Sequence, residues 1–224
     1  MNCKLLLCCG YLLLFFLESN SLFAQKSSKF KSKEKKGFVR VEAEHFNSQV
    51  QTDKRRWYVV KANSLSLPKP DPDDAHYSTA SSQAYLEILP DTRRTHDDPL
   101  VVGESFSNEA GQMAILSYRI KFKNPGKYFV WVKAYSTGTE DNGIHVGLDG
   151  NWPESGQRMQ WCEGKQKWTW ESKQRTEANH CGEAQKIFIE VETPGWHEVM
   201  FSMREDGFEF DAFVLSQKYE QPLD

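Results

Sequence analysis

The chain has 224 residues, with 28 Lys and Arg against 31 Asp and Glu and a formal net charge of -3. This balance argues against a general binder of nucleic acid or anionic membranes, because such proteins carry an excess of clustered positive charge. The length suits one well-covered core and is marginal for two, so we expect one folded domain.

The first 24 residues are typical of a secretory signal. One positive charge precedes an apolar core over residues 5–17, and Ala24 offers a cleavage point. The apolar run of about thirteen residues is shorter than the roughly twenty that span a bilayer. We therefore expect a soluble mature protein that is secreted or periplasmic, with no membrane span. A lipidation site at Cys8 is the alternative, although that cysteine comes very early in the segment.

Lysine and serine dominate residues 25–37. A segment of this composition cannot bury enough apolar surface to fold, which favours a disordered basic leader. A basic tether to an acidic polysaccharide is the alternative function for this segment.

Cleavage after Ala24 would remove three of the five cysteines and leave Cys162 and Cys181. An even number of cysteines in an oxidising compartment predicts a disulfide between them. A bridge that closes a loop of this size stabilises a protein by about 3 kcal/mol on the chain-entropy estimate. Two separate buried thiols are the alternative.

Apolar residues alternate with period two along much of the chain, which predicts β-strands. The alternating runs cover residues 116–122, 128–134, 187–191, 199–203 and 208–214. Turn residues separate them at Asn124-Pro125-Gly126, Pro194-Gly195 and Asp206-Gly207. The pattern predicts an all-β jelly-roll sandwich over residues 38–218.

Two long loop insertions interrupt this pattern, at residues 62–112 and 149–182. The first is rich in Ser, Pro, Asp and Asn, and the second in Trp, Lys, Glu and Gln. Long loops in compact domains are more often functional than idle, so we expect the binding site to involve them.

Acidic segments lie near both ends of the predicted sandwich, Glu42-Ala43-Glu44-His45-Phe46 and Gly207-Phe208-Glu209-Phe210-Asp211. Two strands also begin with Pro-Gly and an aromatic residue, at 125–128 and 194–196. These features resemble the family 6-like carbohydrate-binding modules and the related C-terminal β-sandwich domain of glucuronidase-type glycoside hydrolases. The resemblance covers most of residues 38–60 and 113–216, but not the two insertions.

Modules of that family commonly hold a structural calcium between the first and last strands, and bind sugar at the loop end or on a sheet face. The resemblance implies a calcium site at Glu42, Glu44 and Asp211. Hard cations prefer several carboxylate oxygens, which suits this set. The alternative is that these acids are solvated on the outer face of an amphipathic strand.

Four tryptophans fall in the second insertion: Trp152, Trp161, Trp168 and Trp170. Flat aromatic rings stack on pyranose rings and remove apolar area from water, which suits a polysaccharide platform. We expect polar partners for sugar hydroxyls from neighbouring loops, namely Asn142, His145, Arg204 and Asp206. The alternative is that the rings pack the insertion around the disulfide, and we expect at least two of them to do so.

Positive residues in the same insertion favour an acidic glycan, although acidic residues are interleaved with them. They are Arg158, Lys165, Lys167, Lys173 and Arg175.

The sequence therefore predicts a secreted, non-catalytic polysaccharide-binding module for an acidic or sulfated glycan. Such a module would hold the glycan near a cell or a carbohydrate-active enzyme. One alternative is a small jelly-roll polysaccharide lyase or glycoside hydrolase, with His145, Arg204 and Tyr135 as candidate catalytic groups. A second is an extracellular protein-interaction domain, in which the tryptophans form the interface.

Overall fold

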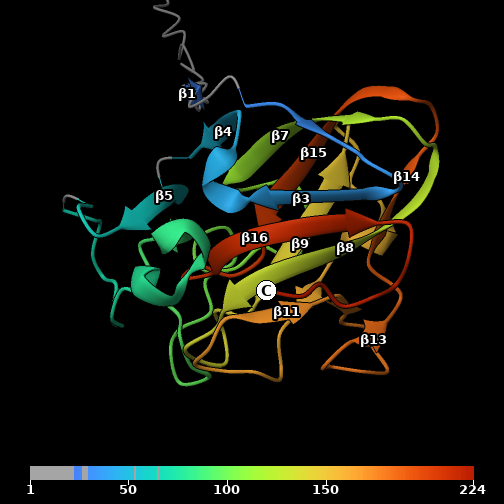
Figure 1. Ribbon diagram of the computed structural model, residues 1–224. Helices are drawn as coiled ribbons and strands as arrows, with labels where there is room; N and C mark the ends of the chain where they lie inside the picture. Colours follow the sequence, from blue (N-terminus) through green and yellow to red (C-terminus); the bar gives the residue numbers. More distant parts are fainter. Residues whose placement is uncertain (1–22, 27–29, 53, 65) are drawn as a thin grey trace, which may run out of the picture.

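The computed structural model describes residues 23–26, 30–52, 54–64 and 66–224. Within these residues the chain forms two β-sheets that pack face to face (Figure 1). The predicted all-β sandwich is confirmed. None of the helical segments in these ranges has the length and hydropathy of a membrane span.

The rear sheet in Figure 1 contains nine strands, and β7 and β15 form its centre. In spatial order its strands are β1 (Phe23–Lys26), β4 (Ser48–Gln51), β7 (Ile115–Phe122), β15 (Gly195–Met203), β9 (Gly143–Leu148), β10 (Met159–Gln160), β12 (Lys173–Gln174) and β13 (Glu183–Ala184), and β2 (Ser32–Lys33) also pairs with β7.

The front sheet contains seven strands, and β8 and β16 form its centre. In spatial order its strands are β11 (Thr169–Glu171), β8 (Gly126–Tyr135), β16 (Glu209–Ser216), β6 (Ala84–Leu89) and β5 (Arg56–Lys61), while β14 (Phe188–Val191) pairs with β8 and β3 (Phe38–Glu42) with β16.

Aromatic residues from both sheets fill the space between them. Phe201 of β15 lies 4.9 Å from Phe210 and 4.9 Å from Phe213 of β16, measured between ring centroids. Tyr118 of β7 packs edge-on to Phe213 at 4.8 Å, and its hydroxyl donates to the carbonyl of Ala43 at 2.7 Å. Period two places Tyr118, Phe201 and Phe210 on the inner faces, as the sequence predicted. Beyond Phe210 the prediction was wrong, because a β-bulge before Ala212 reverses the alternation, so that Phe213 packs in this core and Ala212 and Val214 belong to a separate cluster.

The outer face of the front sheet is also covered, so all eight residues of β16 are buried. The 66–83 segment, with the short 3-10 helices η2 (Tyr77–Thr79) and η3 (Ser81–Gln83), lies at the end of the sheet where β16 begins (Figure 1) and contacts Glu209 and Asp211 there. The last residues of the chain cover the other end, where the Asp224 carboxylate lies 2.7 Å from the ammonium group of Lys133. This covering buries polar side chains on the outer face of β16.

The two insertions are less irregular than expected. The 62–112 insertion supplies β6 to the front sheet, and the 149–182 insertion supplies β10, β11 and β12 together with the 3-10 helix η4 (Glu154–Gly156). The strands β10, β11 and β12 have only two or three residues each, too few to show a period, so the sequence pattern did not reveal them. The predicted disulfide between Cys162 and Cys181 is present and ties β10 to the β12–β13 turn.

The leader differs from the expectation of disorder. Residues Ser32–Lys33 form β2 beside β7, and the Glu34 carboxylate is buried, where it accepts from the backbone N–H of Lys123 at 2.8 Å and from Asn124 Nδ2 at 2.9 Å. The predicted signal, residues 1–24, lies outside the described residues except for its last two, which begin β1.

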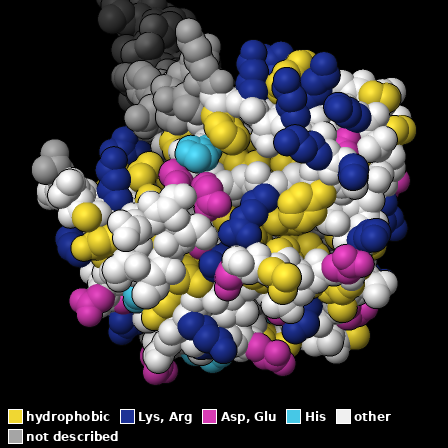
Figure 2. Space-filling view, in the orientation of Figure 1, with side chains coloured by type: hydrophobic (Ala, Val, Ile, Leu, Met, Phe, Trp, Pro, Cys, Tyr) yellow, Lys and Arg dark blue, Asp and Glu magenta, His cyan; other side chains and the backbone are white. Residues whose placement is uncertain are grey.

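Figure 2 shows Lys and Arg side chains gathered at the upper edge of the visible face, over the region of β2 and β14.

Candidate functional site

An open groove of about 540 Å³ lies at the end of the sandwich where β15 ends. This volume falls within the roughly 300–1,000 Å³ typical of small-ligand sites. Three arginines from different parts of the chain face it, and we call it the arginine groove. Its lining residues are Phe106, Asn108, Arg158, Arg175, Thr176, Glu177, His180 and Arg204.

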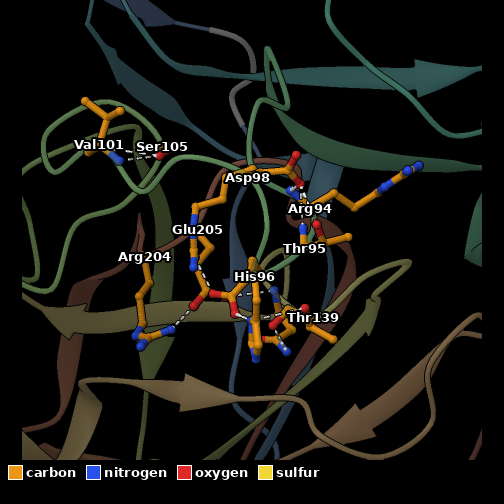
Figure 3. Close-up of polar contacts among 12 residues, drawn as sticks. Arg94, Thr95, His96, Asp98, Val101, Ser105, Thr139, Arg204 and Glu205 are labelled. Atoms are coloured by element: carbon orange, nitrogen blue, oxygen red, sulfur yellow. Dashed lines mark hydrogen bonds and ion pairs between the residues drawn. The ribbon is translucent and has the colours of Figure 1, made fainter.

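Arg204 is fixed between an aromatic ring and a glycine. Its guanidinium lies 5.0 Å from the ring centroid of Phe106, within range of a cation-π contact. On the strand beside it, a Cβ at Gly143 would stand 2.7 Å from Arg204 Nη1, so a larger residue there would displace the arginine. Arg204 also forms an ion pair with the buried Glu205, and the two side chains run in the same direction (Figure 3).

The loop that carries Phe106 is held by its own hydrogen bonds. Asp98 Oδ2 accepts from the backbone N–H groups of Arg94 and Thr95 at 3.1 and 2.8 Å (Figure 3). The N–H of Ser107 donates to the carbonyl of Arg204 at 2.8 Å, which fixes the loop to the end of β15. The Phe106 ring is therefore positioned before any ligand arrives.

Three guanidinium groups and one carboxylate, that of Glu177, line the groove, and two of the arginines are paired with Glu154 and Glu205. Arg158 pairs with Glu154, but its Nε is buried without a hydrogen-bond partner, as is Nε of Arg204. Among the described residues Arg175 makes no ion pair, and desolvation followed by the nearby charge of Arg204 lowers its pKa. Guanidinium groups in this state can bind carboxylate or sulfate oxygens with charge-assisted hydrogen bonds.

Of the residues expected to bind sugar, Arg204 lies in the arginine groove and the other seven lie elsewhere. The sequence analysis also marked Arg158 and Arg175 as favouring an acidic glycan, and both line it. It missed Phe106 and His180. For Phe106 the available signal was an aromatic residue within a polar loop. Nothing in the sequence distinguished His180 as a groove residue.

His145 and Asn142 are buried beneath the groove. His145 Nε2 donates to the carbonyl of Ser107 at 3.1 Å, and its Nδ1 accepts from the backbone N–H of Arg158 at 3.0 Å. Asn142 Nδ2 donates to the carbonyl of Thr139 at 2.9 Å. Both side chains are occupied by internal hydrogen bonds and support the loops around the groove.

The protein should lose stability as the pH falls from about 6.5 to about 4, in part through His145. Burial lowers the pKa of His145 from 6.5 to about 4. Below pH 6.5 the unfolded chain therefore takes up a proton that the folded chain does not, and stability falls until the pH reaches the folded pKa. A difference of roughly 2.5 pKa units corresponds to a loss of about 3 kcal/mol.

Urea unfolding at pH 7, 5.5 and 4.5 measures this loss, with His145→Gln as the control because glutamine can keep both hydrogen bonds without titrating. We expect the variant to lose less stability than the wild type over this range. Equal losses in the two proteins would contradict the assignment.

The four tryptophans of the insertion do not form one platform. Trp161 and Trp170 are 1% and 5% exposed. They pack against the sandwich, Trp161 on Phe208 and Trp170 in a cluster with Trp131, whereas the alternative from the sequence was packing around the disulfide. Trp152 is half-buried against the backbone of Gly111 and Gly147, and Trp168 donates from Nε1 to the Thr79 hydroxyl at 3.2 Å. The four rings therefore pack in different places on the sandwich and do not share one surface.

Asp206 is also internal. Its side chain is 0% exposed and forms a 2.7 Å ion pair with Arg55. The catalytic trio considered for a lyase is not assembled either, because His145 lies on β9 of the rear sheet and Tyr135 on β8 of the front sheet, where it stacks on His76.

The three acids of the expected calcium site lie near enough for their charges to act on one another. Asp211 accepts from the backbone N–H of Ser81 at 2.9 Å and lies 3.5 Å from Lys133 Nζ. Burial, with the charges of Glu42 and Asp211, raises the pKa of Glu44 to about 7. Glu42 Oε2 and Glu44 Oε2 are buried and have no hydrogen-bond partner within the part of the chain that the structure describes. Among the described residues, however, the groups whose ligand atoms lie within 4.8 Å of one another do not include this set.

Comparisons with known proteins place the chain beside one curated relative. It is 59% identical over 183 residues to the uncharacterized protein P23 of Formosa agariphila, and this match covers 82% of the chain and 44% of that protein. The chain thus spans less than half the length of the curated relative it matches. No family model matches the chain.

Among solved structures, the exo-β-1,3-galactanase of Phanerochaete chrysosporium with galactose aligns with 80% of the chain and 29% of its own length. The TM-score is 0.37 and the sequence identity 8%. A likeness of this strength indicates neither a shared fold nor a shared function.

Proposed function

We propose that this protein is an extracellular polysaccharide-binding β-sandwich that holds an acidic or sulfated glycan in the arginine groove without cleaving it. The observation that carries the proposal is the convergence of Arg158, Arg175 and Arg204 on one open groove. The disulfide supports an oxidising compartment outside the cytoplasm.

The chemistry of the groove suits sulfate or uronic-acid groups. A guanidinium matches two oxygens of a carboxylate or sulfate at once, and the Phe106 ring beside Arg204 offers a flat apolar surface for the sugar ring. Because Arg204 is held in place before binding, little side-chain entropy is lost when the ligand arrives. The groove is open, which suits a polymer that enters and leaves at its sides.

Glu42, Glu44 and Asp211 would hold the structural calcium that the family resemblance implies. Their orphaned carboxylate oxygens support this assignment. Calcium would supply charge neutralisation there, between η1 (Ala43–His45), which follows β3, and the strand β16.

Replacing Arg175 with glutamine should weaken retention of a sulfated or uronic polysaccharide about 10- to 100-fold. The reason is the loss of one charge-assisted contact worth roughly 1.5–3 kcal/mol. Affinity electrophoresis against neutral, uronic and sulfated polysaccharides measures the change, with new reducing or unsaturated ends assayed in the same samples. Retention should also fall steeply with added salt.

The control is Arg119→Gln, which removes the same charge from β7 of the rear sheet, away from the groove. It should leave retention within about twofold of the wild type. Equal retention of neutral polysaccharides, or no effect of Arg175→Gln, would refute acidic-glycan binding in this groove. New chain ends would instead show that the protein is an enzyme.

A further inference from the structure

A second cluster of ligand-type side chains lies on the outer face of the front sheet, apart from the arginine groove and the calcium residues. Asp73, His76 and Glu209 form one group, and Asp71, Asp73 and Glu87 form another. Within each group the nearest nitrogen and oxygen atoms all lie within 4.8 Å of one another. Asp73 belongs to both groups, so five side chains surround one small region.

The fold itself brings these residues together. Glu209 of β16 and Glu87 of β6 are direct cross-strand partners, so their side chains leave the sheet on the same face. The 66–83 segment lies at the end of the sheet where β16 begins and supplies the other three. His76 Nδ1 lies 2.9 and 3.0 Å from the two carboxylate oxygens of Glu209, and its ring stacks on Tyr135 at 3.7 Å.

The cluster has too little positive charge for its burial. Glu87 and Glu209 are 3% and 2% exposed, and among the described residues neither has a Lys or Arg partner. Within the described ranges, the one Lys or Arg ion pair of the cluster joins Asp71 to Lys69, an exposed residue. By contrast, the buried Asp206 and Asp211 have Arg55 and Lys133. Burying two neighbouring carboxylates without a cation is costly.

The carboxylates at and beside the base of the cluster have few hydrogen-bond donors. Glu87 accepts one hydrogen bond among the described residues, from the Tyr85 hydroxyl at a long 3.4 Å, although the group is almost fully buried. Its neighbour Asp91 is 3% exposed, and Oδ1 of Asp91 is buried without any hydrogen-bond partner. Buried oxygens without donors are rare in folded proteins unless a water or an ion satisfies them.

We propose that Asp71, Asp73, His76, Glu87 and Glu209 bind a divalent cation that fastens the 66–83 segment to the front sheet. The ligand set is four carboxylates and one imidazole. Carboxylates suit Ca²⁺ and Mn²⁺, whereas imidazole suits the transition ions and Zn²⁺, so the mixed set favours Mn²⁺ or Zn²⁺ over Mg²⁺. The ion would act as a structural clamp, because two ligands come from the sheet and three from the segment above it.

The test uses the whole protein after chelation and dialysis, with Mn²⁺, Zn²⁺ and Ca²⁺ added one at a time. Calorimetric titration measures affinity and stoichiometry, and the melting temperature reports the clamp. We expect saturable binding of Mn²⁺ or Zn²⁺ that raises the melting temperature. Asp73→Asn removes the shared ligand and should weaken that binding at least tenfold. Limited proteolysis within the 66–83 segment should slow when the ion is bound.

Two further variants keep the result interpretable. Asp74→Asn changes the exposed neighbour in the same segment and should bind the ion as the wild type does. His76→Gln alters a half-buried ligand and should shift the preference from Zn²⁺ toward Ca²⁺ even if Asp73→Asn fails to fold. Absence of saturable binding to the chelated wild type would overturn the proposal. So would loss of Mn²⁺ or Zn²⁺ binding in Glu44→Gln but not in Asp73→Asn or His76→Gln, because the ion would then belong to the calcium residues.

Discussion

Replacing Trp161 with alanine should lower the free energy of unfolding by about 3–5 kcal/mol, the usual cost of removing a large aromatic ring from a core. Trp161 is 1% exposed and packs edge-on to Phe208 at 5.1 Å between ring centroids. Its Nε1 donates to the carbonyl of Thr169 at 3.1 Å, so the substitution leaves both a cavity and an acceptor without its donor. Urea unfolding monitored by circular dichroism gives the change.

Trp168→Ala is the matched control from the same insertion. Its ring keeps part of its exposure and touches Tyr85 and Tyr135 edge-on, so we expect a loss of about 1–2 kcal/mol. A small loss of stability in Trp161→Ala together with loss of glycan retention would contradict the core assignment. That result would mean that the ring faces a ligand, as a polysaccharide platform requires.

The sequence predicted the strands in which polar residues alternate with apolar ones. In β7 the buried Leu116, Tyr118 and Ile120 alternate with residues such as Arg119 and Lys121, so the period was visible. The pattern in β9 was not, because Gly143–Leu148 is buried on both faces apart from its last residue. A strand of that kind has no polar face to mark its period.

The candidate site was harder to predict because sequence marks charge but not burial. Arg204 and Asp206 are two residues apart and both are buried in ion pairs, with Glu205 and with Arg55, yet only Arg204 also lines the groove. Asp71, Asp73 and His76 lie close together in the sequence and are residue types that bind metal ions. Their spacing could have indicated half of a metal site. Their partners Glu87 and Glu209 could not be identified in this way, because pairing between β6 and β16 is a product of the topology.

Replacing Asp206 with asparagine should destabilise the protein by about 3–5 kcal/mol, because it leaves the guanidinium of Arg55 buried without its counter-charge. Arg55 is 6% exposed and donates to Asp206 Oδ2 from Nη2 at 2.7 Å and from Nε at 3.2 Å. The same oxygen accepts from the N–H and the hydroxyl of Thr92, at 2.9 and 2.6 Å. One carboxylate oxygen thus joins three segments of the chain, and urea unfolding at neutral pH measures its contribution.

Glu104→Gln is the control, because it breaks a 2.6 Å ion pair with Lys54 that lies on the surface, next to Arg55 in sequence. Exposed pairs contribute about 0–1 kcal/mol, since water and salt screen them. Both variants remove one carboxylate charge from an ion pair. The difference between their losses of stability therefore measures the effect of burying the pair. If Asp206→Asn cost no more stability than Glu104→Gln and instead reduced glycan retention, Asp206 would be a sugar ligand, as its sequence position first suggested. We expect the opposite order, since the Asp206 side chain is 0% exposed and cannot reach a sugar at the surface.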